Sequence, residues 1–452
     1  MRTLKTLSLL TLFASLLLTS CNKDLEPEEL SSVSSKGKGI GPERNSKSFQ
    51  LVQTIEIGGE GAAEISAFDP STNRLFTVNS TIDGVNVYDI SDLGMPDPVG
   101  TITGLGGAPT SVASNNNGVI AVAVEADPSQ DPGSVLLFDA ATLIPIGSPY
   151  TVGPLPDMVT FTPDGQKILV ANEGEPSDDY SWDPEGSVSI IDLSTGNIAT
   201  ATFSSYNGLE NSPGFESFRV FGPGATLAQD VEPEYIAVSD DSKFAWVSLQ
   251  ENNGLALVNI DAGTIDAIYP LGFKDYSDPF NSIDPSDRDG IKSLRTVPAF
   301  GMFQPDGIAY ANIKGQGIIV TANEGDARDY DAFSEEKRVE DLVLDPTAFP
   351  NAVDLQLEEN LGRLEITTTL GDTDGDGDYD ELYSYGARSF SIWSETGQLI
   401  YDSGNDIGQQ TLRLTPERFN DDDGRSDAKG GEPEAVVILQ LRKNKWLLFV
   451  GL

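Results

Sequence analysis

The chain has 452 residues, with 71 Asp and Glu against 28 Lys and Arg, one cysteine and no histidine. The lack of histidine excludes Ser-His-Asp and Cys-His catalysis and His-ligated zinc, and a single cysteine excludes disulfides within the chain. A net charge of −43 argues against nucleic acid as a partner and favours hard cations bound through oxygen.

The first residues predict an exported lipoprotein. Residues 1–20 combine a basic start with an apolar run that is too short to span a bilayer, which is typical of a signal peptide. Residues 18–21, Leu-Thr-Ser-Cys, resemble the lipobox of bacterial lipoproteins, and the chain's one cysteine, Cys21, stands where the lipidated residue belongs. Residues 21–48 are polar and predict a flexible tether. Asn22 fits sorting to the outer membrane, and Lys23-Asp24 followed by Glu26 loosely resembles the surface-export signals of lipoproteins, so we expect a lipid-anchored body that is exposed at the cell surface.

From residue 49 onward, the chain repeats a unit of short apolar strands. The third strand of the unit is β-branched or aromatic and is closed by a polar turn residue. It recurs at Val85–Asp89, Val135–Asp139, Val188–Asp192, Leu255–Asn259 and Phe390–Ser394. The early spacing matches one four-stranded blade, and no stretch shows sustained helical periodicity. The sequence therefore predicts an all-β fold over residues 49–452, a β-propeller of YVTN or WD40 type, with a pair of β-sandwiches as the alternative.

The two ends of this repeat region decide whether the ring of blades can close. Residues 51–55 resemble residues 98–102, the fourth strand of the first unit, so we expect them to complete the last blade. The chain ends at Leu452, just after the second strand of a sixth unit, and we therefore expect a C-terminally truncated ring. Polar insertions lengthen the later units, and the largest lies near residues 326–387.

One acidic run in that insertion has the spacing of a calcium loop. Residues 371–381 place carboxylates at alternate positions with Gly377 at the sharp turn, as in the D-x-D-x-D-G pattern of an EF-hand-like loop. The twelfth position is Tyr383 instead of Glu, and no helix pair flanks the loop. A solvated acidic turn is the alternative, but so compact a group of like charges favours a bound Ca²⁺. The predicted ligands are Asp372, Asp374, Asp376, Asp378, Asp380 and Glu381.

A second group of carboxylates recurs at the ends of strands. First strands begin with Pro-Asp or Pro-Glu, and second strands end with Asn-Glu-Gly or with Gln250-Glu251-Asn252. In a propeller the first strands line the central channel in one direction, so these side chains are expected at one height around the axis. A ring of like charges requires a cation, shared protons or a basic ligand, whereas repeated turn chemistry is the alternative. The candidate channel residues are Asp157, Glu173, Glu234, Asp306, Glu324 and Glu434.

Several motifs together resemble the choice-of-anchor I family, which is related to the mesenchyme-specific cell-surface glycoprotein of biomineralising animals. These motifs are Asn172–Gly174, Pro233–Ile236, Ser286–Gly290, Gln304–Gly307, Gly371–Leu382, Tyr385–Phe390 and Glu432–Glu434. The resemblance covers about residues 49–452 and implies a secreted or surface-tethered, seven-bladed propeller, of which this chain would lack the last one or two blades. Gly431 and Ala435 depart from the family pattern, in which Pro and Gly are usual. Members are often labelled alkaline phosphatase, yet this chain has no histidine to hold zinc beside a phosphatase nucleophile.

Two functions are open on these grounds. The favoured one is a lipid-anchored, calcium-binding surface propeller that acts as a binding or structural module for a polysaccharide, a mineral or a protein. The alternative is a calcium-dependent phosphoesterase in which channel carboxylates hold the metal. Such an enzyme also needs basic residues to receive phosphate, and the sequence has few of them near the strand starts. Arg388 could meet an anionic group, but an exposed salt bridge is the simpler interpretation.

Overall fold

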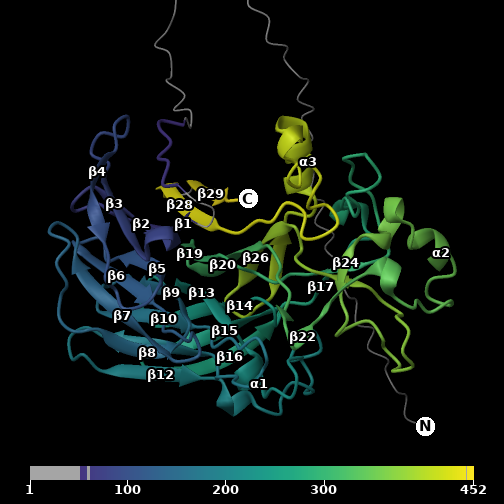
Figure 1. The fold of residues 1–452 in the computed structure, drawn as a ribbon, viewed down its shortest axis with the longest axis horizontal. Helices are drawn as coiled ribbons and strands as arrows, with labels where there is room; N and C mark the ends of the chain where they lie inside the picture. Colours follow the sequence, from purple (N-terminus) through teal and green to yellow (C-terminus); the bar gives the residue numbers. More distant parts are fainter. Residues whose placement is uncertain (1–50, 59–61, 444) are drawn as a thin grey trace, which may run out of the picture. The chain divides into compact units, whose positions relative to one another are not determined.

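The computed structural model describes residues 51–58, 62–443 and 445–452, and Val52–Leu452 forms one compact unit. The predicted signal peptide, Cys21 and the tether lie outside the described residues. The fold is all-β, with many four-stranded antiparallel sheets and few helices (Figure 1).

Five sheets share one plan, in which four antiparallel strands pair in chain order. The first contains β1 (Ala62–Asp69), β2 (Arg74–Asn79), β3 (Gly84–Asp89) and β4 (Asp97–Ile102). The second contains β5 (Pro109–Ser114), β6 (Val119–Val124), β7 (Pro132–Asp139) and β8 (Tyr150–Pro154). The third contains β9 (Pro156–Phe161), β10 (Lys167–Asn172), β11 (Ser187–Asp192) and β12 (Ile198–Thr202). The fourth contains β13 (Pro233–Val238), β14 (Phe244–Leu249), β15 (Gly254–Asn259) and β16 (Thr264–Pro270). The fifth contains β19 (Ile308–Ile313), β20 (Gln316–Asn323), β26 (Ser389–Ser394) and β27 (Leu399–Asp402).

The five predicted third strands are confirmed as β3, β7, β11, β15 and β26. The polar residue that closes each of them accepts a backbone hydrogen bond from the following turn. Examples are the Thr142 N–H to Asp139 Oδ1 at 2.7 Å and the Ser194 N–H to Asp192 Oδ1 at 2.9 Å. Side chains of this kind satisfy a turn's donors locally, which explains why the closing position is polar in every unit.

Apolar cores lie between successive sheets. The first strands contact one another in the order β1, β5, β9, β13, β19 and then β28 (Val436–Arg442), as Figure 1 also shows for β5, β9 and β13. Between the first two sheets, Phe76 and Val87 pack with Val122. Between the fourth and fifth sheets, Trp246 stacks on Tyr310 of β19, and Trp393 belongs to the same core. The second to fifth sheets are therefore covered on both faces by their neighbours, which is why their second strands are mostly apolar.

The predicted insertion between β20 and β26 is present and has an apolar core of its own. That core joins Phe349, Leu361 and Ile366 of the insertion to Tyr276 and Val297 of an earlier segment. The small strands here are β17 (Phe273–Asp275), β18 (Phe300–Met302), β21 (Asp329–Tyr330), β22 (Phe333–Ser334), β23 (Glu336–Arg338), β24 (Glu365–Thr367) and β25 (Tyr383–Ser384). The helical segments of the described chain are α1 (Leu227–Asp230), α2 (Ala352–Leu355) and α3 (Asp406–Leu414), 3-10 turns at Ser80–Ile82, Ser204–Tyr206, Pro279–Asn281, Val339–Asp341 and Pro416–Arg418, and a π turn at Glu358–Gly362.

The expected closing strand at residues 51–55 is not formed. Residues 51–58 contain no strand, and Val52 is exposed. The last sheet consists of β28 and β29 (Lys445–Val450). The prediction was wrong because a fourth strand needs a third one beside it, and β29 pairs with β28 alone among the described strands.

Candidate functional site

The predicted calcium loop lies just before β25 and curls around one carboxylate. Asp372, Asp374 and Asp376 are exposed, and one carboxylate oxygen from each lies within 4.8 Å of the others. The N–H groups of Gly375 and Gly377 donate to the two oxygens of Asp372, at 2.8 and 3.1 Å. Both glycines have positive φ angles, 78° and 98°, which a residue without Cβ adopts freely. The sequence pattern therefore produces a turn that gathers three carboxylates.

A second group of three carboxylates lies next to it. Oxygens of Asp378, Asp380 and Asp345 also lie within 4.8 Å of one another. The Asp345 N–H donates to the carbonyl of Tyr379 at 3.0 Å, which fixes this distant residue beside the loop. Partial loss of solvent, and then the charges of Asp376 and Asp345, raise the pKa of Asp378. Sequence reasoning missed Asp345 because only the tertiary fold brings it to the loop.

Glu381 belongs to neither group. Its Oε2 accepts a hydrogen bond from the hydroxyl of Tyr383, and burial together with this carboxylate raises the pKa of Tyr383. Tyr383 in turn packs against Phe273 and Phe300, which draws Glu381 towards β25. Five of the six predicted ligands are thus divided between two groups of three that are completed by Asp345, and Glu381 lies outside both.

The predicted channel carboxylates come together at the ends of the first and second strands. Burial, and then the charges of Glu251 and Asp306, disfavour ionisation of Glu234 on β13, and the nearby Glu173 and Asp157 add to this effect. Asp306, just before β19, interacts in the same way with Glu324 and Glu434. Glu234 and Asp306 also interact with each other, so the two halves are connected. The connected set is Asp157, Glu173, Glu234, Asp306, Glu324 and Glu434.

Three further acids belong to this group of carboxylates. Glu251 follows β14, Glu175 follows β10, and Glu232 precedes β13. Glu232 and Glu251 are buried, at 1% and 5% exposure. The signal for Glu232 was present in the sequence, since it flanks the same proline as Glu234. Glu175 lies two residues beyond the Asn-Glu-Gly turn, and no pattern in the sequence marks it.

Burial raises the pKa of most of these carboxyl groups above the usual range, and repulsion between them adds to it; the groups concerned are Glu173, Glu175, Glu232, Glu234, Glu251, Asp306 and Glu324. The pKa of Asp306 rises to about 8, mainly through burial and then through Glu324 and Asp157. Burial likewise raises the pKa of Glu324 to about 7, against the opposing charge of Lys429. Burial, and then the charges of Glu251 and Asp306, also raise the pKa of Glu234 well above its usual range. Near neutral pH, several of these groups therefore hold protons unless a cation replaces them.

Two of the buried acids have oxygen atoms without partners. Glu234 Oε2 and Glu251 Oε2 are enclosed and accept no hydrogen bond. Both side chains are more than nine-tenths buried, so water does not solvate these atoms freely. Because an unsatisfied buried acceptor costs about 1–3 kcal/mol, these oxygens are suited to a proton or to a cation.

The basic residues in this region are already paired. Arg328 Nη1 lies 2.7 Å from Asp230 Oδ1, and its Nη2 lies 3.0 Å from Glu232 Oε1. Lys429 forms an ion pair with Asp326. Arg328 and Lys429 both lie near the channel acids, although the sequence pattern did not link their segments with the starts of strands. They reduce the negative charge of the group but leave more acids than bases.

The Choice-of-anchor I domain profile matches residues 64–452, most of the chain. The chain belongs to the choice-of-anchor I family. This membership confirms the resemblance and supports a module associated with the cell surface or cell envelope. In the part of the chain that the structure describes, no helix has the length and apolar content needed to cross a bilayer.

Two individual proteins resemble parts of this choice-of-anchor I domain. Gigasin-3a of Magallana gigas is 35% identical over 109 residues, which make up 22% of this chain and 38% of that protein. The chain thus spans little more than a third of that relative. The solved structure of Kuenenia stuttgartiensis hydrazine synthase shares 14% identity and a TM-score of 0.31 with this chain, covering 58% of this chain and 80% of that one.

The chemistry available to this choice-of-anchor I domain is that of oxygen ligands. The acidic loop and Asp345 together offer two groups of three carboxylates, one exposed and one half-buried, and the strand ends offer a buried group with unsatisfied oxygens. Oxygen-rich sites of this kind prefer Ca²⁺ or Mg²⁺ to transition metals. The exposed groups are accessible to ions from solution, whereas the buried acids must first lose their protons.

Proposed function

We propose that this choice-of-anchor I domain is a calcium-binding surface module, held at the outer membrane by a lipid on Cys21. Its sheets are the blades of a β-propeller in this proposal. The contacts between first strands of successive sheets, with apolar cores between the sheets, support that arrangement. The module binds an extracellular polysaccharide, mineral or protein.

The observation that carries the calcium assignment is the close grouping of Asp372, Asp374 and Asp376. Ca²⁺ takes six to eight oxygens at about 2.3–2.6 Å, so oxygens within 4.8 Å of one another can contact one ion. Water molecules would complete the shell of such an exposed site. The neighbouring group of Asp345, Asp378 and Asp380 supports a second ion or an enlarged site.

Calcium titration by calorimetry tests this assignment. We expect the full chain to bind calcium and the Asp372→Asn, Asp376→Asn double variant to lose the heat of the loop site, because the loss of two charged ligands removes most of its attraction for Ca²⁺. A matched control, Asp92→Asn with Asp97→Asn, removes the same charge from two exposed positions near β4 and should titrate like the wild type. Equal heats from the wild type and the loop variant would contradict the assignment.

A second candidate function is a calcium-dependent phosphoesterase at the channel acids. One observation favours it over the sequence-based expectation: Lys429 is a basic side chain close to Glu324. A bound metal would polarise a phosphate oxygen, and Lys429 would help to receive the anion. Turnover of p-nitrophenyl phosphate and phytate, with and without calcium, on the wild type and Asp306→Ala decides between the two. Calcium-dependent turnover that Asp306→Ala abolishes would favour the enzyme, and its absence would favour the binding module.

A further inference from the structure

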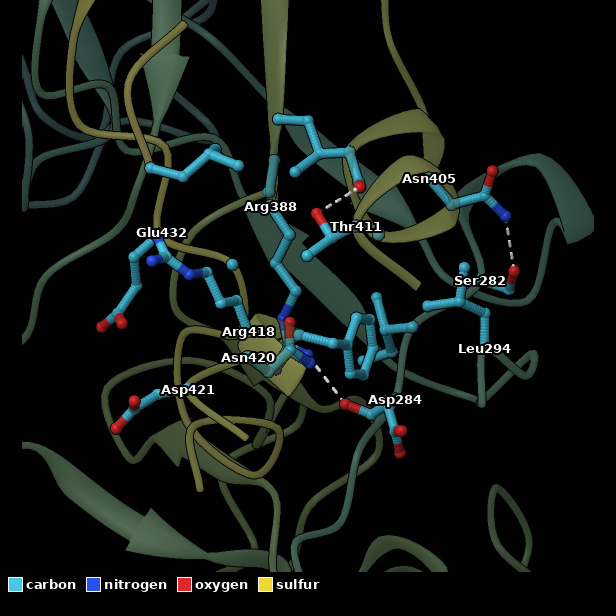
Figure 2. A pocket seen from close by; sticks show the side chains of 18 of the residues that line it. Ser282, Asp284, Leu294, Arg388, Asn405, Thr411, Arg418, Asn420, Asp421 and Glu432 are labelled. Carbon is cyan, nitrogen blue, oxygen red and sulfur yellow. Dashed lines mark hydrogen bonds between the residues drawn. The ribbon is translucent and has the colours of Figure 1, made fainter. Parts of the chain in front are cut away.

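A cavity of about 630 Å³ opens beside α3, away from the calcium loop. Its walls come from α3, from the turn that follows this helix, and from segments near Asp284 and Gly430. Small-molecule sites in proteins occupy about 300–1,000 Å³, so the cavity has the size of a ligand site. Figure 2 shows that the side chain of Arg388 extends into the middle of this group of residues.

Arg388 is buried at 8% exposure, which is the reverse of the exposed salt bridge expected from the sequence. Its Nη1 donates to the carbonyl of Asp284 at 2.8 Å and its Nη2 to the carbonyl of Ala428 at 2.6 Å. Its Nε–H has no acceptor. Two of the five N–H donors are thus used, both by neutral carbonyl groups.

The guanidinium charge of Arg388 forms no ion pair within the described residues. The nearby carboxylate of Asp427 lies 2.9 Å from Arg363, so its charge is already matched. Glu432 is matched in the same way by Arg425. Asp284 turns its Oδ2 to the Ser293 N–H at 2.7 Å, and its Oδ1 accepts no hydrogen bond, so this carboxylate places a negative charge near Arg388 without forming an ion pair with it. Because a buried charge without a counter-ion is costly, an anionic group in the cavity would stabilise Arg388.

The residues that line the cavity limit which kind of anion can bind in it. Leu294, Ile407 and Phe419 form an apolar side against which a ring can pack. Exposed carboxylates such as Glu417 and Asp421 lie at the lining beside Arg418, where they repel a dianion more strongly than a monoanion and accept hydrogen bonds from hydroxyl groups. A monoanion that carries several hydroxyl groups satisfies both conditions.

We propose that this pocket binds a sugar acid, with its carboxylate against Arg388, its ring against the apolar side and its hydroxyl groups towards the acidic lining. The proposal names a ligand class for the surface module, yet the pocket shares no residue with the calcium loop. Its test is therefore made in EDTA, so that the loss of calcium binding and the loss of sugar-acid binding are separate results.

Calorimetry with D-glucuronate, D-glucose and inorganic phosphate on the full chain tests the proposal. We expect glucuronate to bind at least about tenfold more tightly than glucose or phosphate, because only glucuronate combines a single carboxylate with a hydroxylated ring. Arg388→Gln should abolish this preference over glucose. Similar affinities for glucuronate and glucose, or for glucuronate and phosphate, would overturn the proposal.

Because Arg388 also holds two carbonyl groups, its variant can fail to fold, and a second variant keeps the test decisive. Thr411→Trp fills the cavity from α3 without changing Arg388. Gln410→Trp places the same ring on the neighbouring exposed position, which does not line the cavity. We expect Thr411→Trp to lose glucuronate binding and Gln410→Trp to keep it. Unchanged glucuronate binding in Thr411→Trp would refute the pocket as the site.

Discussion

The channel acids make a quantitative prediction about pH and stability, and Asp306→Asn isolates it. In the folded chain the pKa of Asp306 is about 8, against 3.8 for the unperturbed group. A carboxyl group whose pKa is raised by folding contributes stability below its unfolded pKa, and this stability is lost as the pH rises through the folded pKa. Calcium-free wild-type protein should therefore become less stable between about pH 4 and pH 8.

The size of this loss follows from the same shift. While Asp306 is ionised in the unfolded chain and protonated in the folded one, the free energy of unfolding falls by about 1.4 kcal/mol per pH unit. Between pH 5 and pH 8 this gives at most about 4 kcal/mol, and relaxation of the site will reduce it to about 2 kcal/mol. Asparagine keeps the shape of the side chain but cannot ionise. The stability of Asp306→Asn relative to the wild type should therefore increase by about 2–4 kcal/mol over this range.

Urea unfolding in EDTA, followed by tryptophan fluorescence at several pH values from 5 to 8, measures this difference. The exposed Asp97→Asn variant is the control, since its side chain lies outside the channel group. Millimolar calcium should reduce the pH dependence of the wild type if a cation replaces the protons. Parallel stability curves for the wild type and Asp306→Asn would refute the argument that burial and repulsion hold protons on this group.

Three further predictions concern the anchor, the core and a close backbone contact. Cys21→Ser should move the protein from the membrane fraction to the soluble fraction after export, and retention in the membrane fraction would contradict a lipid anchor on Cys21. Trp393→Ala should lower the free energy of unfolding by about 3–5 kcal/mol, as judged by urea midpoints, because this ring is 1% exposed; a loss below about 1 kcal/mol would contradict its place in the core. Gly386→Ala should be more destabilising than Gly147→Ala in the same assay, since both have positive φ but only at Gly386 would a Cβ meet Glu324 O, at 1.8 Å; equal losses would show that the backbone adjusts.

The parts of the fold that sequence analysis predicted are those with local causes. The third strands combine a short apolar run with a closing polar residue. In the turns after Asp139 and Asp192, this residue accepts a hydrogen bond from an N–H group no more than three positions away. The predicted strand at residues 51–55 resembles the fourth strand of the first unit, but no third strand lies beside it among the described residues. A strand is stabilised by its partner, and the partner lies elsewhere in the chain.

The candidate sites also divide into features with local causes, which the sequence predicts, and features that depend on tertiary contacts. Alternating aspartates and a glycine were enough to predict the turn around Asp372, whereas Asp345 reaches the loop only through the packing of the insertion. Arg388 was expected at the surface because nothing near it in sequence indicates burial. Carbonyl groups of Asp284 and Ala428, both distant in sequence, hold its guanidinium inside the protein. Tertiary contacts of this kind leave no periodic pattern.

The insertion within the fifth sheet has a consequence for the order of folding. In the first four sheets, strands that pair are close together in the chain, so each sheet closes short loops. In the fifth sheet, β20 and β26 pair only after residues 324–388 have been accommodated between them. Closing a longer loop costs more chain entropy and slows the formation of the contact. The first four sheets can therefore form early as the chain folds, and the Trp393 side of the fifth sheet will form late, together with the core of the insertion that bears the acidic loop.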